Sequence, residues 1–173
     1  MSNLKKIPFL LLLAMLWVSS SCEKDDICDP ATATTPQVVI DFYDITNPTL
    51  TKNVTNLLVV GDGMDTGLAF NAVHTIKIPL KITADLTKFQ FILNYGNTVT
   101  PSLVNSDVWQ FNYTRNNLYV SRACGYKTLF NLDESNPYAL SELTPTGSPW
   151  IKNIVVNTYQ ITNENETHVK VFF

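Results

Sequence analysis

Apolar and polar residues alternate over much of the chain after residue 36, and this period of two restricts the fold more than any other feature. In HTIKIPLKI (residues 74–82), the apolar side chains fall on the even positions from 76 to 82. Such alternation is typical of a strand with one buried face. Comparable patterns occur at residues 37–44, 54–60, 88–95, 107–113, 118–124, 152–161 and 167–173. About seven to nine short strands predict an all-β fold, an antiparallel β-sandwich of immunoglobulin-like architecture.

The segments between these patterns predict the local connections. The short TRNN (114–117) favours a β-hairpin between the patterns that flank it, and TNENE (162–166) favours a second hairpin at the C-terminus. One helix is also expected. Asn136 can cap a helix and Pro137 suits its first turn, so we predict one short helix near residues 137–143.

The N-terminal 21 residues have the layout of a secretory signal peptide. Lys5 and Lys6 precede an apolar run of 12 residues, Ile7–Val18, and three serines follow it. This run is too short for the roughly 20 apolar residues that cross a bilayer as a helix. The polar stretch 22–36 then reads as a tether. We therefore expect a signal peptide at 1–21, a tether at 22–36 and a β-sandwich domain at 37–173.

Cys22 follows the apolar run and the three small residues, which resembles a bacterial lipobox. In such a sequence the cysteine receives a diacylglycerol thioether and becomes the mature N-terminus. Each buried acyl CH2 contributes roughly 0.8 kcal/mol, so several chains hold a protein durably on a membrane. We expect lipidation at Cys22; the alternative is an ordinary signal peptide that is cleaved nearby.

The other two cysteines, Cys28 and Cys124, form an even pair once Cys22 is assigned to lipid. An exported protein meets an oxidising environment, in which disulfides form. We predict a disulfide between Cys28 and Cys124 that fixes the N-terminal arm to the middle of the domain. The alternative is two unpaired thiols, one of them buried.

Charge and motif content exclude several classes of function. Without the two signal lysines, the chain keeps ten basic and 15 acidic residues, a net charge of −5, which argues against nucleic-acid binding. No cysteine–histidine cluster has the spacing of a metal site, and we expect no metal and no cofactor. The loop GDGMDTG (61–67) contains Asp62 and Asp65, but their spacing is not that of an EF-hand, and we interpret it as a turn.

Few residues are candidates for chemistry or ligand binding. His74 and His168 fall on the polar side of their alternating patterns, so we predict that both are surface side chains. No nucleophile-elbow motif is present, and no catalytic residue is assigned. Trp150 follows Ser148 and Pro149 at a junction between a loop and a strand. It is a candidate ligand contact if exposed, and a plug at the end of the core if buried.

Four stretches carry a resemblance: CEKDDIC (22–28), TPQVVIDFYD (35–44), SRACG (121–125) and the C-terminal THVKVFF. Together they resemble a family of Bacteroidetes envelope lipoproteins of unknown function. The resemblance implies a location rather than an activity. It also implies a surface-export signal at Lys24, Asp25 and Asp26, directly after the lipidated cysteine. The alternative is that these charges form a solvated spacer.

From these observations we expect a non-enzymatic protein that is anchored to the outer membrane by lipid, exposed either on the cell surface or to the periplasm. Its expected partners are the membrane, through the N-terminal lipid, and an envelope protein or a glycan. A structural accessory subunit of an envelope complex is the alternative. A hydrolase with a site assembled from distant strands is a third possibility.

Overall fold

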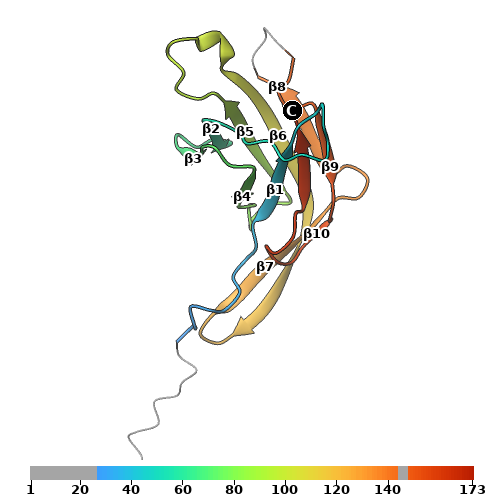
Figure 1. Cartoon of the computed structure of the whole chain (residues 1–173). Coiled ribbons are helices and arrows are strands. Elements are labelled where there is room, and N and C mark those ends of the chain that lie inside the picture. Colours follow the sequence, from blue (N-terminus) through green and yellow to red (C-terminus); the bar gives the residue numbers. More distant parts are fainter. Residues whose placement is uncertain (1–26, 144–147) are drawn as a thin grey trace, which may run out of the picture. The chain divides into compact units, whose positions relative to one another are not determined.

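The computed structural model describes residues 27–143 and 148–173, which form two compact units. The smaller unit consists of the chain up to Thr32 together with Tyr119–Tyr126, and the larger unit contains Ala33–Leu118 and Lys127–Phe173. The whole apolar core belongs to the larger unit. Each unit is described by itself below (Figure 1).

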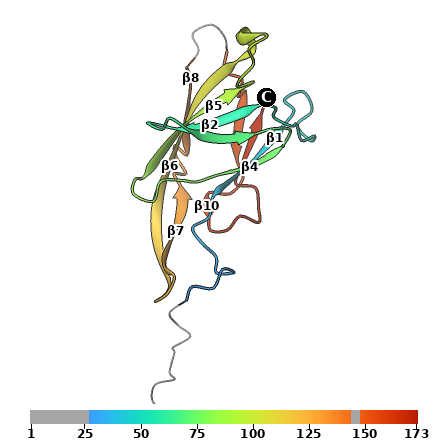
Figure 2. The same ribbon diagram turned by 90° about the vertical axis from the view of Figure 1, so that its left-hand side faces the viewer.

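The described residues contain two β-sheets. One sheet has the strand order β4-β1-β11-β9 and the other has the order β10-β7-β6-β5-β2-β3, with β8 pairing to β6 beside this path (Figures 1 and 2). The strands are β1 (Val38–Tyr43), β2 (Leu57–Gly61), β3 (Gly67–Phe70), β4 (Thr75–Ile78), β5 (Leu86–Leu93), β6 (Asn105–Ser121), β7 (Gly125–Leu132), β8 (Tyr138–Glu142), β9 (Asn153–Val156), β10 (Gln160–Ile161) and β11 (Val169–Phe172). A 3-10 turn, η2, spans Pro101–Leu103.

This architecture confirms the predicted β-sandwich. All the strand pairs with a described register are antiparallel except β1 and β11, which run parallel with Ile40 opposite Val169. Within residues 27–143 and 148–173 there are 11 strands rather than seven to nine, because several are short: β10 has two residues, and β3, β4, β9 and β11 have four each.

Alternation along the strands builds the core. On β1, Val38, Ile40 and Phe42 have no exposed surface, and on β6 the same parity buries Trp109 and Phe111. Trp109 and Phe111 stack with ring centroids 4.4 Å apart. Aromatic side chains bury large apolar areas, so this strand contributes strongly to the free energy of folding.

The predicted helix at 137–143 is wrong, because Tyr138–Glu142 form strand β8. Tyr138 lies opposite Phe111 on β6, and the pairing continues as far as Glu142 opposite Asp107. The side chain of Asp133 accepts hydrogen bonds from the backbone N–H groups of Ser135 and Asn136, so the polar residues before Pro137 form a turn rather than a helix cap. Pairing along β6 outweighs the weak helical preference of so short a segment.

The predicted hairpin turn at residues 114–117 is also wrong. β6 runs without interruption from Asn105 to Ser121, and the chain turns only at residues 122–124. Gly125 ends this turn with a φ of +69°, a conformation that glycine adopts without a steric penalty. TRNN contains no glycine or proline, so nothing in it interrupts strand pairing.

The C-terminal hairpin prediction is confirmed only in part. β9 and β11 pair antiparallel, with Val156 opposite Val169. Between them, however, β10 leaves this sheet and pairs with β7 of the other one, with Ile161 opposite Phe130. Ile161 is completely buried, and the gain from burying it favours this crossing.

Candidate functional site

A disulfide joins Cys28 and Cys124 in the smaller unit, as the sequence predicts. The two Cα atoms are 4.9 Å apart and 96 positions separate the residues in the sequence. The backbone N–H of Cys124 also donates a 3.0 Å hydrogen bond to the hydroxyl of Ser121 in the same turn. The bridge ties the N-terminal arm to the β6–β7 turn, and a disulfide of this kind is typical of an oxidising compartment.

A shallow groove lies in the larger unit on the exposed face that β6, β7 and β10 share. Its volume is about 260 Å³, below the usual 300–1,000 Å³ of an enclosed small-molecule site. The strand pairing places Gln160 directly opposite Asn131 across this face. The lining residues are mostly polar and come from three segments far apart in the sequence: Thr114, Arg115, Asn116, Leu129, Phe130, Asn131, Gln160 and Thr162.

The polar side chains of the groove are available to a ligand. Among residues 27–143 and 148–173, no side-chain hydrogen bond involves Thr114, Asn116, Asn131 or Gln160, and all four residues are exposed. An amide side chain both donates and accepts hydrogen bonds, so it can contact a peptide backbone or a sugar hydroxyl equally well. The groove therefore offers neutral hydrogen-bonding groups rather than charge.

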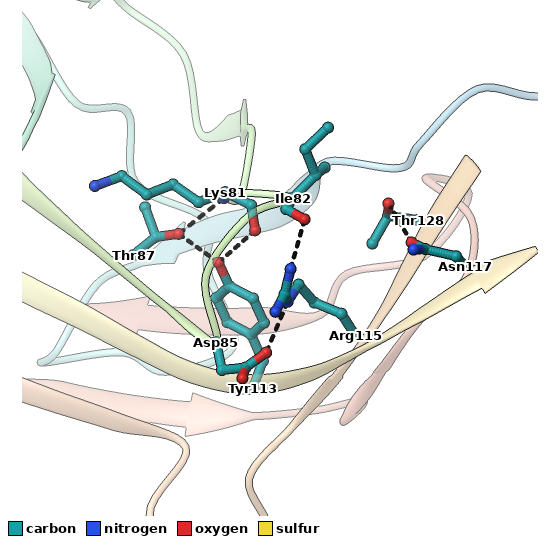
Figure 3. A network of polar contacts seen from close by, with 8 residues as sticks. All are labelled: Lys81, Ile82, Asp85, Thr87, Tyr113, Arg115, Asn117 and Thr128. Carbon is teal, nitrogen blue, oxygen red and sulfur yellow. Dashed lines mark hydrogen bonds and ion pairs between the residues drawn. The ribbon is translucent and has the colours of Figure 1, made fainter. Parts of the chain in front are cut away.

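A hydrogen-bond network holds β6 in place directly beside the groove (Figure 3). The Tyr113 hydroxyl donates to the carbonyl of Lys81 at 2.8 Å and lies 2.7 Å from the Thr87 hydroxyl, which also accepts from the Lys81 backbone N–H at 2.9 Å. Burial raises the pKa of Tyr113, so the phenol keeps its proton.

Arg115 extends this network towards the same loop. Its Nε donates to Asp85 at 2.7 Å and its Nη1 donates to the carbonyl of Ile82 at 2.7 Å (Figure 3). The guanidinium is therefore occupied by residues 82–85. The network fixes the backbone of β6 between Tyr113 and Arg115, where the groove begins.

Trp150 is part of the core, so of the two roles that the sequence allowed it has the buried one and not that of an exposed ligand contact. Only 6% of the residue is exposed. Its indole Nε1 donates a 3.1 Å hydrogen bond to the carbonyl of Phe91, and its ring packs against Phe42 and Phe173 at centroid distances of 6.2 and 5.4 Å. A ring that is packed inside the core has no free face on which a ligand could stack.

Asp107 is the most deeply buried acid of the described chain and has no exposed surface. Its Oδ2 accepts a 2.9 Å hydrogen bond from the backbone N–H of Ile151. Burial raises the pKa of Asp107, and the nearby carboxylate of Glu142 raises it further. Since a substrate cannot reach this carboxyl, its role is to hold the segment before β9 against β6.

The two histidines differ, and the surface prediction holds only for His74. His168 is completely buried, and its Nδ1 accepts a 2.9 Å hydrogen bond from the backbone N–H of Val39. Burial lowers the pKa of His168, so the ring is neutral at neutral pH. The alternating pattern predicted the wrong side for His168, because this residue precedes β11 and its ring is held against the backbone of Val39 on β1.

Some predicted features lie elsewhere. The loop with Asp62 and Asp65 is a turn between β2 and β3, and the described residues contain no group of three or more acidic, histidine or cysteine side chains that could hold a metal ion. Cys22, Lys24, Asp25 and Asp26 lie outside the described residues. Within the described ranges, no helix has the length and apolar character needed to span a membrane.

Sequence reasoning did not find the groove. Its lining residues come from 114–116, 129–131 and 160–162, and apart from Leu129 and the buried Phe130 they are ordinary polar residues of exposed strands. Alternation would have placed the exposed polar residues on the solvent side, but only the pairing of β7 with β10 brings Asn131 and Gln160 together.

Comparison with known proteins assigns the chain to a family without assigning an activity. No curated protein and no solved structure gives a significant match. The model of DUF6452, a family of unknown function, matches residues 56–173. This range contains all the residues that line the groove and also Cys124, while Cys28 precedes it. The chain belongs to the family of unknown function DUF6452.

Proposed function

We propose that this chain is a non-enzymatic, lipid-anchored protein of the cell envelope that binds a partner protein through the groove on β6, β7 and β10. The observation that carries the proposal is the set of exposed side chains without a hydrogen-bond partner in the described structure, at Thr114, Asn116, Asn131 and Gln160. Such neutral donors and acceptors match the backbone of a bound polypeptide, with Leu129 as the apolar contact between them.

Two further observations support the proposal. The Cys28–Cys124 disulfide is consistent with export to an oxidising compartment. The burial of Trp150 removes that ring as a stacking surface for a sugar, and Phe130, the aromatic residue that lines the groove, is buried too, which favours a protein over a glycan as the partner at this groove. A structural accessory subunit without a ligand of its own remains the alternative.

A hydrolase is the third candidate, and the groove gives it little support. Of the lining residues, only Arg115 carries a charge, and its guanidinium is bound to Asp85 and Ile82. Proton transfer at neutral pH generally uses a histidine, an acid or a cysteine, and none of these lines the groove.

Site-specific photocrosslinking tests the binding surface. A photoreactive amino acid replaces Asn131 in the groove of the full membrane-anchored protein, and another replaces Val99, which is 90% exposed in the larger unit, as the matched control. We expect a discrete protein adduct from position 131 and none from position 99. Equal adduct formation at both positions contradicts the proposed surface. Capture of envelope glycan that Asn131→Ala and Gln160→Ala abolish would identify a glycan partner instead.

Membrane fractionation tests the anchor. Intact mature protein should carry the mass of acyl chains, and Cys22→Ala should move it out of the membrane fraction, since Cys22 is the proposed attachment point. Protease treatment of whole cells then tests the surface-export signal. We expect digestion of the native protein and protection after combined replacement of Lys24, Asp25 and Asp26 by alanine. Intact mature protein without the mass of acyl chains would exclude the lipid anchor.

A further inference from the structure

We propose that the smaller unit forms a second, non-covalent contact with the membrane, in which Tyr119, Tyr126 and Ile27 enter the lipid interface. This inference rests on the proposed lipid anchor at Cys22. In this proposal the Cys28–Cys124 disulfide keeps the β6–β7 turn close to the lipid that is attached to the N-terminal arm.

The first argument is exposure. Tyr126 is 70% exposed, Tyr119 is 52% exposed and Ile27 is 82% exposed. The two tyrosine rings contact each other edge to face, with centroids 5.3 Å apart, so β6 and β7 present them as one aromatic pair. Leaving such side chains in water costs free energy that burial at an interface recovers.

The second argument is the chemistry of these side chains. Tyrosine is enriched where hydrocarbon meets lipid headgroups, because its ring is apolar and its hydroxyl can remain hydrated. An open hollow of about 410 Å³ lies in the same unit, and Asp29 and Arg122 are its only charged lining residues. These two charges cancel within the described part of the unit, so the contact depends on apolar area and not on attraction to anionic lipid.

The third argument is the length of chain between the lipid and the disulfide. Six positions separate Cys22 from Cys28, so even a fully extended chain spans only about 20 Å. The Cα of Cys124 lies 4.9 Å from that of Cys28. An acylated Cys22 therefore restricts the turn at residues 122–124 to the neighbourhood of the headgroups. A soluble partner protein competing for the tyrosines would have to fit within the same short distance.

Quenching by brominated lipids tests the contact in full-length lipidated protein on vesicles of neutral phosphatidylcholine. Tyr126→Trp introduces a reporter, and Tyr95→Trp, at an exposed tyrosine of the larger unit, is the matched control. Trp109 and Trp150 are buried and provide a constant background. We expect quenching of the Tyr126→Trp protein at least about twofold above the control, because an interfacial side chain touches the acyl region. High salt should leave this difference unchanged.

Three outcomes separate the proposals. Protein that floats with the vesicles but shows equal quenching for Tyr126→Trp and Tyr95→Trp overturns the membrane contact and leaves the anchor intact. Protein that does not float overturns both. If high salt abolishes the quenching, the apolar contact is wrong and electrostatic attraction holds the unit on the membrane.

A second experiment tests the role of the disulfide. Combining Cys28→Ala and Cys124→Ala with Tyr126→Trp should lower quenching to the control level while flotation persists. Full quenching without the disulfide excludes the role assigned to the bridge.

Discussion

Asp107 on β6 and Glu142 on β8 lie directly opposite each other, and each has a buried carboxylate oxygen without a hydrogen-bond partner in the described structure. Two like charges facing each other across a strand pair oppose folding. Asp107 lessens this cost because its raised pKa favours the protonated form. The pair therefore makes the stability of the sandwich depend on pH.

Asp107→Asn should stabilise the protein at pH 7. The asparagine oxygen can still accept the hydrogen bond from Ile151, and the amide adds a donor towards Glu142. We expect a gain of about 1 kcal/mol in the free energy of unfolding, since a buried charge is removed without loss of a partner.

The same substitution should change the pH dependence of stability. A group whose pKa is raised on folding stabilises the fold below its unfolded pKa, and that contribution is lost as pH rises through the folded pKa. Urea titrations from pH 4 to 7 should therefore show a flatter profile for the variant. Asp107→Ala, which leaves the Ile151 N–H unpaired, is the destabilising comparison.

His168 should limit stability on the acidic side. Folding lowers the pKa of His168, so around and below the ordinary histidine pKa of about 6.5 the unfolded state binds more protons than the folded state. The free energy of unfolding therefore decreases as the pH is lowered through that range. Protonation would also place a second donor against the Val39 N–H. His168→Asn keeps an acceptor at this position and should remove the histidine's contribution to the pH dependence between pH 8 and 5, measured by urea unfolding. His74→Asn alters an exposed histidine and should leave the slope unchanged. Identical slopes in the wild type and His168→Asn would contradict the assignment.

Tyr113→Phe should loosen the loop that the network of Figure 3 fastens to β6. The change removes the donor to the Lys81 carbonyl and the partner of Thr87, and we expect a loss of about 1–2 kcal/mol. Tyr95→Phe removes the hydroxyl of an exposed tyrosine and serves as the control. Hydrogen exchange at residues 79–87 locates the effect. Faster exchange confined to other segments would show that the hydroxyl does not hold this loop.

Replacing both Cys28 and Cys124 by alanine should lower the free energy of unfolding by about 2–4 kcal/mol, because the bridge closes a long loop in the unfolded chain. Fluorescence of Trp109 and Trp150, both in the larger unit, reports the transition. Reductant should destabilise the wild type and leave the double variant unaffected. A wild type that is indifferent to reductant would mean that the bridge adds nothing to the stability of the larger unit.

Gly67→Ala should destabilise the β2–β3 hairpin. A Cβ added at Gly67 would lie 2.5 Å from the carbonyl oxygen of Val59, and a backbone atom in a strand cannot move aside cheaply. We expect a loss of about 1–3 kcal/mol in thermal or urea unfolding. Gly61→Ala is the matched control, because its added Cβ would meet the flexible side chain of Met64. Equal stability of the two variants would show that the hairpin adjusts at residue 67.

The sequence by itself determined the all-β class and most of the core, because burial follows a period of two along β1, β4, β5 and the first half of β6. It also predicted the Cys28–Cys124 pairing, once Cys22 was assigned to lipid, and the structure contains this bridge. The fold class depends on the local alternation of apolar and polar residues, and the predicted disulfide depends on the number of cysteines.

Only the tertiary structure decided the rest. Residues 138–142 form a strand because they pair with β6. β10 pairs with β7 instead of extending the C-terminal hairpin, because Ile161 lies opposite Phe130. His168 and Trp150 are buried by contacts with Val39 and Phe91, residues more than 50 positions away in the sequence. The groove likewise exists only where three distant segments meet. Long-range pairing and packing set these outcomes, and no local pattern of the chain encodes them.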